Sequence, residues 1–300
     1  MRLFVVGRAG QIARSLREAA VWETDLVLQS VGRPEVDLLQ PGVVAAAIAK
    51  FRPDIVVNAA AYTAVDRAED EPGVAFAINR DGAREVAAAA ASEKVPIIHF
   101  STDYVFDGTK SGPYKEQDAP NPQNVYGRSK LEGERAVMSV NIRQIVLRTS
   151  WVYAPFGSNF VQTIWRKLVE GQRPKIVNDQ TGCPTYAADL AAATIALGRR
   201  LIRTGWQSDY AGITHMVGSE AVTWYDFGCL IAKRYMAETA RSAEIIPVSS
   251  SEYAARAVRP ANSRLSTERL QSVFDIRLPS LQTSLDNCLD RILQEQGGQS

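Results

Sequence analysis

Three side chains in the first half of the chain have the chemistry needed to act on a single carbonyl group. Thr102 carries a hydroxyl, Tyr126 a phenol and Lys130 an ammonium group. Tyr126 and Lys130 are four residues apart, so on a helix they lie on one face. A phenol has a pKa of about 10, and a neighbouring cation lowers this pKa toward the range useful for proton donation. These residues predict a site where Tyr126 protonates a carbonyl oxygen that Thr102 holds by a hydrogen bond.

A tyrosine four residues before a lysine is a weak signal alone, and the elements around it give it weight. Apolar runs predict strands over 2–6, 26–31, 54–58, 95–101 and 144–149, and helical patterns lie between and after them, up to 124–138. This alternation favours a parallel sheet with helices on both faces, that is, a Rossmann-type doubly wound α/β fold. Ligands bind at the carboxyl ends of such strands, and Thr102 directly follows the fourth strand.

A glycine turn joins the first strand to the first helix. Gly7-x-x-Gly10-x-x-Ala13 lets the backbone approach a pyrophosphate, whose charge is favoured at a helix N-terminus. The second strand has no Asp or Glu at its tip, where an acid would bind the ribose of NAD. Arg33 follows that strand and could bind the 2′-phosphate of NADPH, although a plain surface charge is an equally good interpretation. The turn predicts NADPH or NADH as cofactor, with NADPH accepted.

The alternation loosens after Trp151, where prolines and aromatic residues become frequent, and it resumes around 189–201 and 212–217. We therefore expect residues 1–150 to form the NAD(P)-binding Rossmann domain, with elements near 187–217 returning to it. Residues 151–300 are expected to form mainly a smaller C-terminal α/β lobe that binds the substrate.

The composition excludes several classes of function. Lys and Arg total 34 against 33 Asp and Glu, so charge gives no reason to expect nucleic acid or a membrane as partner. No apolar run approaches the roughly 20 residues that span a bilayer. Cys183, Cys229 and Cys288 form no C-x-x-C pair, which predicts mostly buried thiols and no zinc site. His99 and His215 lie in apolar stretches and are expected to be packed and hydrogen-bonded. A cytoplasmic enzyme fits this pattern.

Longer segments around these residues resemble the extended short-chain dehydrogenase/reductases and, more narrowly, the dTDP-4-dehydrorhamnose reductase family. The Arg52–Asp66 and Asn124–Leu131 segments are common to the superfamily. Three segments are closer to the narrower family: Ser101-Thr102-Asp103-Tyr104-Val105-Phe106, Arg148-Thr149-Ser150-Trp151-Val152-Tyr153 and Arg259-Pro260-x-Asn262-Ser263.

The resemblance implies reduction of the 4-keto group of dTDP-4-dehydrorhamnose, a dTDP-sugar, by NADPH or NADH. It makes Tyr126 the acid, Lys130 the group that lowers its pKa and binds the nicotinamide ribose, and Thr102 a sugar-positioning residue. Asp103 and Trp151 would contact the sugar nucleotide, and Trp151 could stack on a base or sugar or simply belong to the core. The glycine turn, Arg33 and the resemblance together give these cofactor positions besides Tyr126 and Lys130: Gly7, Gly10, Gln11, Ile12, Arg33, Asp37, Leu38, Ala61, Tyr62 and Thr63.

The resemblance also bears on metal binding and on assembly. Some members are described as dimers with Mg²⁺ held by glutamates. By alignment, two of those positions are Ser15 and Ala188 in this chain, and neither side chain can replace a carboxylate. We therefore expect no metal site, and a monomer or weak homodimer.

Other functions remain open on the sequence. One is a different nucleotide-sugar reductase or epimerase. A dehydratase would add an acidic pair beside the hydroxyl, and Asp103 has no neighbouring Glu. Another open function is that of a non-catalytic NADP-binding regulatory subunit. The intact set of Thr102, Tyr126 and Lys130 argues against it.

Overall fold

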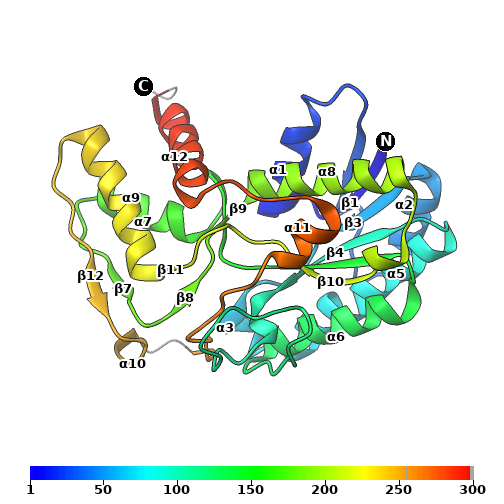
Figure 1. The fold of residues 1–300 in the computed structure, drawn as a ribbon, viewed down its shortest axis with the longest axis horizontal. Coiled ribbons are helices and arrows are strands. Elements are labelled where there is room, and N and C mark those ends of the chain that lie inside the picture. Colours follow the sequence, from blue (N-terminus) through cyan, green and yellow to red (C-terminus); the bar gives the residue numbers. More distant parts are fainter. Residues whose placement is uncertain (254–255, 298–300) are drawn as a thin grey trace.

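A six-stranded sheet forms the centre of the protein in the computed structural model, which describes residues 1–253 and 256–297 (Figure 1). Every neighbouring pair of its strands is parallel. The strands in spatial order are β10 (Gly212–His215), β5 (Gln144–Thr149), β4 (Ile97–Thr102), β3 (Ile55–Asn58), β1 (Arg2–Val6) and β2 (Val27–Val31). The chain starts in the sheet, winds outward to β2 and returns to β3, so the predicted doubly wound fold is confirmed.

Alternation along the buried strands divides the apolar side chains between the two faces of the sheet. Leu3 and Val5 enter one core cluster, while Phe4 and Val6 enter another on the opposite face. Helices α1 and α8 cover the first face, and α5 and α6 lie on the other side in Figure 1. The helices packed around the sheet are α1 (Gln11–Ala20), α2 (Val43–Phe51), α3 (Val65–Ala68), α4 (Pro72–Phe76), α5 (Ala83–Ser92), α6 (Val125–Val140), α8 (Ala187–Thr204) and α11 (Glu268–Phe274).

The helical stretch between β3 and β4 is interrupted by a π-helical segment, Ala77–Gly82. The wider turn directs Asn79 sideways, and its amide donates to the Tyr62 carbonyl (3.0 Å) and the Ser129 hydroxyl (2.9 Å). Its Oδ1 also accepts from the Tyr62 N–H at 2.8 Å. Contacts across the fold therefore override the regular pattern that the alanine-rich sequence favours.

A further core cluster, separate from the two beside the sheet, fills the part of the molecule shown at the left of Figure 1. Its helices and short paired strands are α7 (Phe160–Val169), α9 (Trp224–Thr239), α10 (Ser250–Tyr253), α12 (Leu281–Gly297), β6 (Val152–Tyr153) with β9 (Thr185–Tyr186), β7 (Lys175–Val177) with β12 (Ile246–Val248), and β8 (Thr181–Gly182) with β11 (Val222–Thr223). Helix α7 was not predicted, although Asn159 caps it and apolar residues recur at helical spacing after it. Its nearby prolines obscured that signal.

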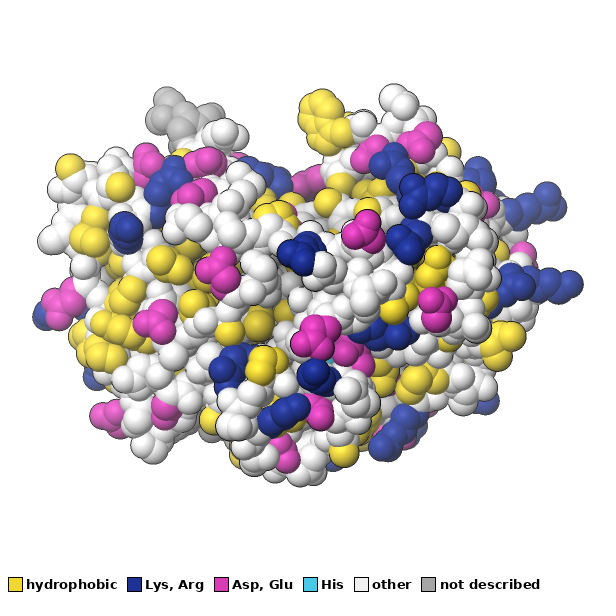
Figure 2. Space-filling model, viewed as in Figure 1, with side chains coloured by type: hydrophobic (Ala, Val, Ile, Leu, Met, Phe, Trp, Pro, Cys, Tyr) yellow, Lys and Arg dark blue, Asp and Glu magenta, His cyan; other side chains and the backbone are white. Residues whose placement is uncertain are grey.

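Both histidine rings lie within hydrogen-bond distance of a neighbouring group, and the cysteine thiols are mostly buried. The His99 ring pairs with the Asn58 amide at 3.1 Å, and the His215 ring lies 3.2 Å from the Ser266 carbonyl. Two of the three cysteine thiols are buried and all three are free. Acidic and basic side chains are interspersed over the face shown in Figure 2. In the described residues no helix is long and apolar enough to cross a membrane.

Candidate active site

Thr102, Tyr126 and Lys130 line one cavity of about 430 Å³ at the carboxyl edge of the sheet. Thr102 ends β4, and Tyr126 and Lys130 lie on the first turns of α6. The cavity also contains the turn before α1 and Trp151, which follows β5. The structure thus brings the three predicted side chains together from separate parts of the sequence.

Two features set the position of α6 against the cavity. The Asn124 side chain caps the helix by accepting from the Gly127 N–H at 2.7 Å. A Cβ on Gly127 would overlap the carbonyl oxygen of Tyr104. Only glycine therefore permits this close approach, which places the Tyr126 side chain beside the segment that follows β4.

Lys130 is fixed by groups on β4 and on its own helix. Its ammonium is buried and donates to the Phe100 carbonyl at 2.7 Å. Burial lowers the pKa of Lys130 to about 8, and the negative charge of Glu134 opposes that change. Glu134 is held in turn by a buried ion pair with Arg148 (2.7 Å) and by the Ser101 hydroxyl (2.5 Å). The lysine side chain therefore has a defined position and remains mostly protonated near pH 7.

The spacing to Lys130 predicted a lowered pKa for Tyr126. In the structure the pKa of Tyr126 is instead raised well above its usual value. The cause is burial, which disfavours the phenolate; the Thr102 hydroxyl opposes this and the Asp103 carboxylate adds to it. The phenol is consequently protonated throughout the neutral range. Protonated phenol is the form that a proton donor requires.

Thr102 makes its hydrogen bonds within the loop that follows β4. Its hydroxyl donates to Asp103 Oδ1 at 3.0 Å and accepts from the Tyr104 N–H at 3.2 Å. Burial raises the pKa of Asp103 to about 6, although hydroxyls of Ser263 and Thr102 lower it. The second carboxylate oxygen of Asp103 is buried without a hydrogen-bond partner among the described residues. Such an orphan acceptor beside the cavity suits a ligand hydroxyl.

A second cavity of about 310 Å³ adjoins the first at Gly10 and continues along the sheet edge. Gly10 precedes α1 with no side-chain cap, and a Cβ at that position would meet nothing within 4 Å. Gly7 has φ +135°, a conformation that glycine adopts readily. The exposed amides at the start of α1 and the elongated space fit a dinucleotide. Predicted positions lining the second cavity are Gly7, Gly10, Arg33, Asp37, Leu38 and Ala61.

Most of the other predicted cofactor positions also lie along these cavities. Gln11, Ile12, Ala61 and Thr63 line the catalytic cavity. Tyr62 does not line it, because its hydroxyl donates to Glu71 at 2.8 Å on the far side of the segment.

The sequence interpretation missed several residues around the cavity. Ser263 influences Asp103, and its Asn-Ser segment had been noticed only as part of the resemblance. Asn159 donates to Gln11 Oε1 at 2.9 Å and thereby links the helix cap of α7 to the turn before α1. Gly157 and Ser158 line the cavity beside it. No local pattern marks the contacts of these residues with the site, because the contacts join segments distant in sequence.

Trp151 lies at the wall of the cavity, yet it is already stacked within the protein. Its ring is parallel to that of Trp224 within 7°, with centroids 3.5 Å apart. The expectation that Trp151 offers a stacking platform to a base or sugar is therefore not met on this face of the ring.

The residues at the implied Mg²⁺ position do not fit a metal. Ser15 and Ala188 line a surface cavity with Glu18 and Arg291. Arg291 donates to Glu18 Oε2 at 2.8 Å, and Arg14 donates to Glu18 Oε1 at 2.8 Å. The single carboxylate is thus satisfied by two guanidinium groups. Within the described ranges, no group of three His, Cys, Asp or Glu side chains could hold a metal ion.

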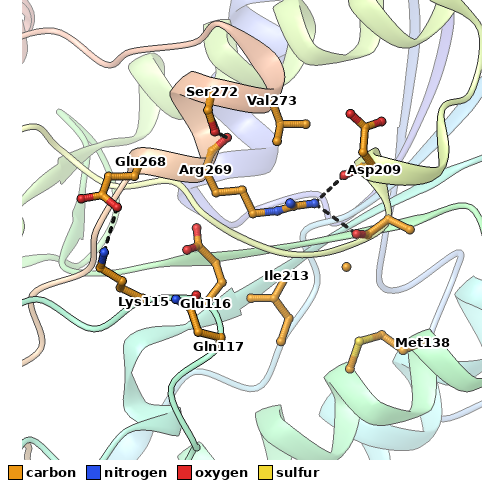
Figure 3. A pocket seen from close by; sticks show the side chains of 12 residues that line it. Lys115, Glu116, Gln117, Met138, Asp209, Ile213, Glu268, Arg269, Ser272 and Val273 are labelled. Carbon is orange, nitrogen blue, oxygen red and sulfur yellow. Dashed lines mark hydrogen bonds and ion pairs between the residues drawn. The ribbon is translucent and has the colours of Figure 1, made fainter.

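A larger cavity, about 720 Å³, lies elsewhere, beside the edge strand β10 (Figure 3). Arg269 donates there to the carbonyls of Asp209 (2.6 Å) and Ala211 (3.1 Å), and Lys115 pairs with Glu268 at 3.0 Å (Figure 3). Its polar side chains therefore bind one another or the backbone beside the edge strand. It shares no lining residue with the carboxyl-edge cavities.

Known proteins resemble this chain over nearly its whole length. Residues 1–294 match the family model described as RmlD substrate binding domain. A curated dTDP-4-dehydrorhamnose reductase of Sinorhizobium fredii is 45% identical, with 98% of this chain and 99% of that protein covered. A crystal structure of a dTDP-4-dehydrorhamnose reductase from Clostridium acetobutylicum has a TM-score of 0.87 and 32% identity, covering 98% of this chain and 100% of that one.

A further crystal structure, a dTDP-4-dehydrorhamnose reductase from Bacillus anthracis in complex with NADP, has a TM-score of 0.86 and 32% identity. The match covers 97% of this chain and 99% of that one. With both the family model and these relatives spanning nearly the whole sequence, the chain belongs to the dTDP-4-dehydrorhamnose reductase family.

Proposed function

We propose that this protein reduces the 4-keto group of dTDP-4-dehydro-6-deoxy-L-mannose to give dTDP-L-rhamnose, using NADPH or NADH. The observation that supports this most is the shared cavity of Thr102, Tyr126 and Lys130, which opens at Gly10 onto the space that fits a dinucleotide. Membership of the family agrees with it.

The dinucleotide, when bound, supplies a hydride to the sugar's C4. Tyr126 donates the proton that the carbonyl oxygen takes up, since burial keeps its phenol protonated. Lys130 places a positive charge beneath that position from its bond to the Phe100 carbonyl. Thr102 must turn its hydroxyl from Asp103 to the sugar oxygen, where the bond strengthens as negative charge develops.

The cofactor end of the site gives a separate proposal. Arg33 is exposed and lines the second cavity with Asp37 and Leu38, which suits the adenine end of the dinucleotide. We expect Arg33→Ala to raise KM for NADPH and to leave KM for NADH unchanged. Equal effects on both cofactors would show that Arg33 does not bind the 2′-phosphate.

We also propose which part of the chain binds each ligand. Residues 1–150, with elements near 187–217, bind the dinucleotide, and residues 151–300 mainly bind the sugar nucleotide. The two arginines on Glu18 support a monomer or weak homodimer without a metal link. The pathway to which the curated relatives' names refer supports a cytoplasmic enzyme.

One assay tests the proposed function. Purified protein is mixed with NADPH and the dTDP-4-keto sugar, NADPH absorbance is followed, and the product is identified by NMR. Oxidation of NADPH with formation of dTDP-L-rhamnose is the expected result. Binding of both ligands without turnover would favour a regulatory subunit, and a different product would favour another nucleotide-sugar reductase or epimerase.

A further inference from the structure

Glu134 continues the row of ionisable side chains that Tyr126 and Lys130 begin on α6. Each of the three lies four residues after the one before it, so all three share one face of the helix. All three are buried, and Glu134 is 0% exposed. Unlike the other two, Glu134 does not line the catalytic cavity. Its influence on the site therefore passes through another residue.

Lys130 and Glu134 bind two consecutive residues at the end of β4. Lys130 donates to the carbonyl of Phe100 at 2.7 Å, and the hydroxyl of Ser101 donates to Glu134 Oε1 at 2.5 Å. Successive turns of α6 are thus attached to neighbouring positions on one strand. A displacement of Glu134 from Ser101 would also displace Lys130 from Phe100.

Arg148 fixes the orientation of the Glu134 carboxylate from β5. Its Nε donates to Oε1 at 2.9 Å and its Nη2 to Oε2 at 2.7 Å. Arg148 lies opposite Ser101 in the sheet, and its guanidinium lies over the Phe106 ring, 5.0 Å from the centroid. This bidentate pairing fixes both oxygens of the carboxylate in one plane.

Stability alone does not require this buried ion pair. Removing two charges from water costs about as much as their attraction returns, and apolar residues of similar volume are often equally stable. Apolar residues cannot supply a negative charge near Lys130. Burial disfavours the charged form of Lys130, which lowers its pKa to about 8, and the charge of Glu134 opposes that change.

The other titratable groups around the ammonium do not change their charge where Lys130 titrates. Burial and the charge of Lys130 hold the pKa of His99 well below its usual value, so that ring is neutral. Burial keeps the phenol of Tyr126 protonated by raising its pKa. Asp103, with a pKa of about 6, is already ionised at pH 8. Removing the charge of Glu134 should therefore appear directly in the titration of Lys130.

We propose that Glu134, held by Arg148 and Ser101, is the positioning residue that keeps the Lys130 ammonium charged and in place against β4. In this way it sets the highest pH at which the enzyme works. The inference rests on the proposed function, because it concerns the residue that supplies positive charge beneath the reacting carbonyl.

The pH profile of kcat tests the role of the charge. Glu134→Gln should lower the pKa of Lys130, so the alkaline limb should move to lower pH by about one unit. That shift leaves about one-fifth of the wild-type kcat at pH 8 and most of it at pH 6. Glu134→Asp keeps the charge and should keep the wild-type limb, even where its shorter side chain lowers the melting temperature. An unmoved limb in Glu134→Gln, or an equal shift in Glu134→Asp, would overturn the proposal.

A double variant covers the case in which Glu134→Gln fails to fold. Glu134→Met combined with Arg148→Met removes both charges and leaves neither one buried alone. Its alkaline limb should move to lower pH, and a wild-type limb would overturn the proposal.

Gly133→Ala is the matched control, because it disturbs packing on the same helix without removing a charge. We expect its alkaline limb to stay at the wild-type pH. A shift equal to that of Glu134→Gln would show that packing, and not the charge of Glu134, is responsible, and the proposal would fail.

NMR gives a readout that does not depend on turnover. The side-chain signal of Lys130, assigned through Lys130→Arg, is followed against pH in the NADP⁺-bound protein. We expect its midpoint to lie at lower pH in Glu134→Gln than in the wild type, and equal midpoints would overturn the inference. A wild-type protein that binds but never turns over the keto sugar would contradict the proposed function and leave this titration measurable.

Discussion

Burial decides the ionisation state of the residues in the candidate site. Tyr126 is buried, so its pKa rises and its phenol remains protonated at neutral pH. Tyr126→Phe removes the phenolic donor and keeps the buried ring. We expect kcat to fall about 10²- to 10⁴-fold while the melting temperature stays within the error of the wild type. Retention of most turnover would refute the assignment of Tyr126 as the acid.

Asp103 gives a pH-dependent prediction. Its folded pKa, about 6, lies above its ordinary 3.8, so the folded state favours the protonated acid. Its ionisation therefore costs stability, and this cost appears as pH rises from about 4 through 6. Asp103→Asn should be more stable than the wild type at pH 8, by on the order of 3 kcal/mol, and equal to it at pH 4. Thermal unfolding at the two pH values measures the difference.

Asp107 is the control for this prediction, because its pKa is shifted the other way. The Thr109 N–H and the Tyr114 hydroxyl hydrogen-bond to its carboxylate and lower its pKa. Its stabilising contribution is present at neutral pH and is lost as pH falls. Asp107→Asn should therefore be less stable than the wild type at pH 8. The same sign for both variants would contradict the assigned environments.

At the level of elements, glycines set how closely α6 approaches its neighbours. A Cβ on Gly133 would overlap the carbonyl oxygen of Asn79 in the π-helical segment. We expect Gly133→Ala to reduce the free energy of unfolding by about 1–3 kcal/mol, because the packed segment has to shift. Denaturant unfolding measures this change.

Gly73 in α4 provides the matched control. A Cβ there meets nothing within 4 Å, so Gly73→Ala should be neutral or stabilise the protein by about 0.4–1 kcal/mol. Equal destabilisation by both variants would mean that the contact with Asn79 does not account for the effect, since helix propensity alone favours alanine at both positions.

Periodicity predicted β1 to β5 and α6 nearly to their ends, because each buries one consistent face or a continuous apolar run. It missed the π-helical segment because Asn79 gains its partners from Tyr62 and Ser129, which are distant in sequence. Helix α7 had a readable cap at Asn159, and the prolines around it were given too much weight.

Across the whole molecule, Asn159 connects the α7 cap to the cofactor turn. Its Nδ2 donates to Gln11 Oε1 (2.9 Å), the Ala154 carbonyl (2.9 Å) and the Phe156 carbonyl (3.1 Å). Asn159→Asp keeps the acceptor for the Gln162 N–H but loses every donor. We expect a loss of about 1–3 kcal/mol in stability and a several-fold weaker NADP⁺ Kd. Calorimetric unfolding and fluorescence titration measure the two effects.

Asn159→Ser separates the lost donors from the added charge, since serine also caps a helix and is neutral. Similar weakening of NADP⁺ binding in both variants would implicate the donors. An unchanged Kd in both would show that the link between Asn159 and Gln11 does not influence the cofactor turn.

The sequence by itself determined the kinds of chemistry available: a phenol and an ammonium on one helix face, a hydroxyl after a buried strand, and glycines before a helix. These features depend on spacing within single elements, and regular geometry carries spacing directly into neighbouring positions. Only the tertiary structure decided that burial raises the pKa of Tyr126. It also decided that Thr102 donates to Asp103 and that Trp224 stacks on Trp151. Desolvation and contacts between distant segments depend on how all the elements pack, which no local pattern encodes.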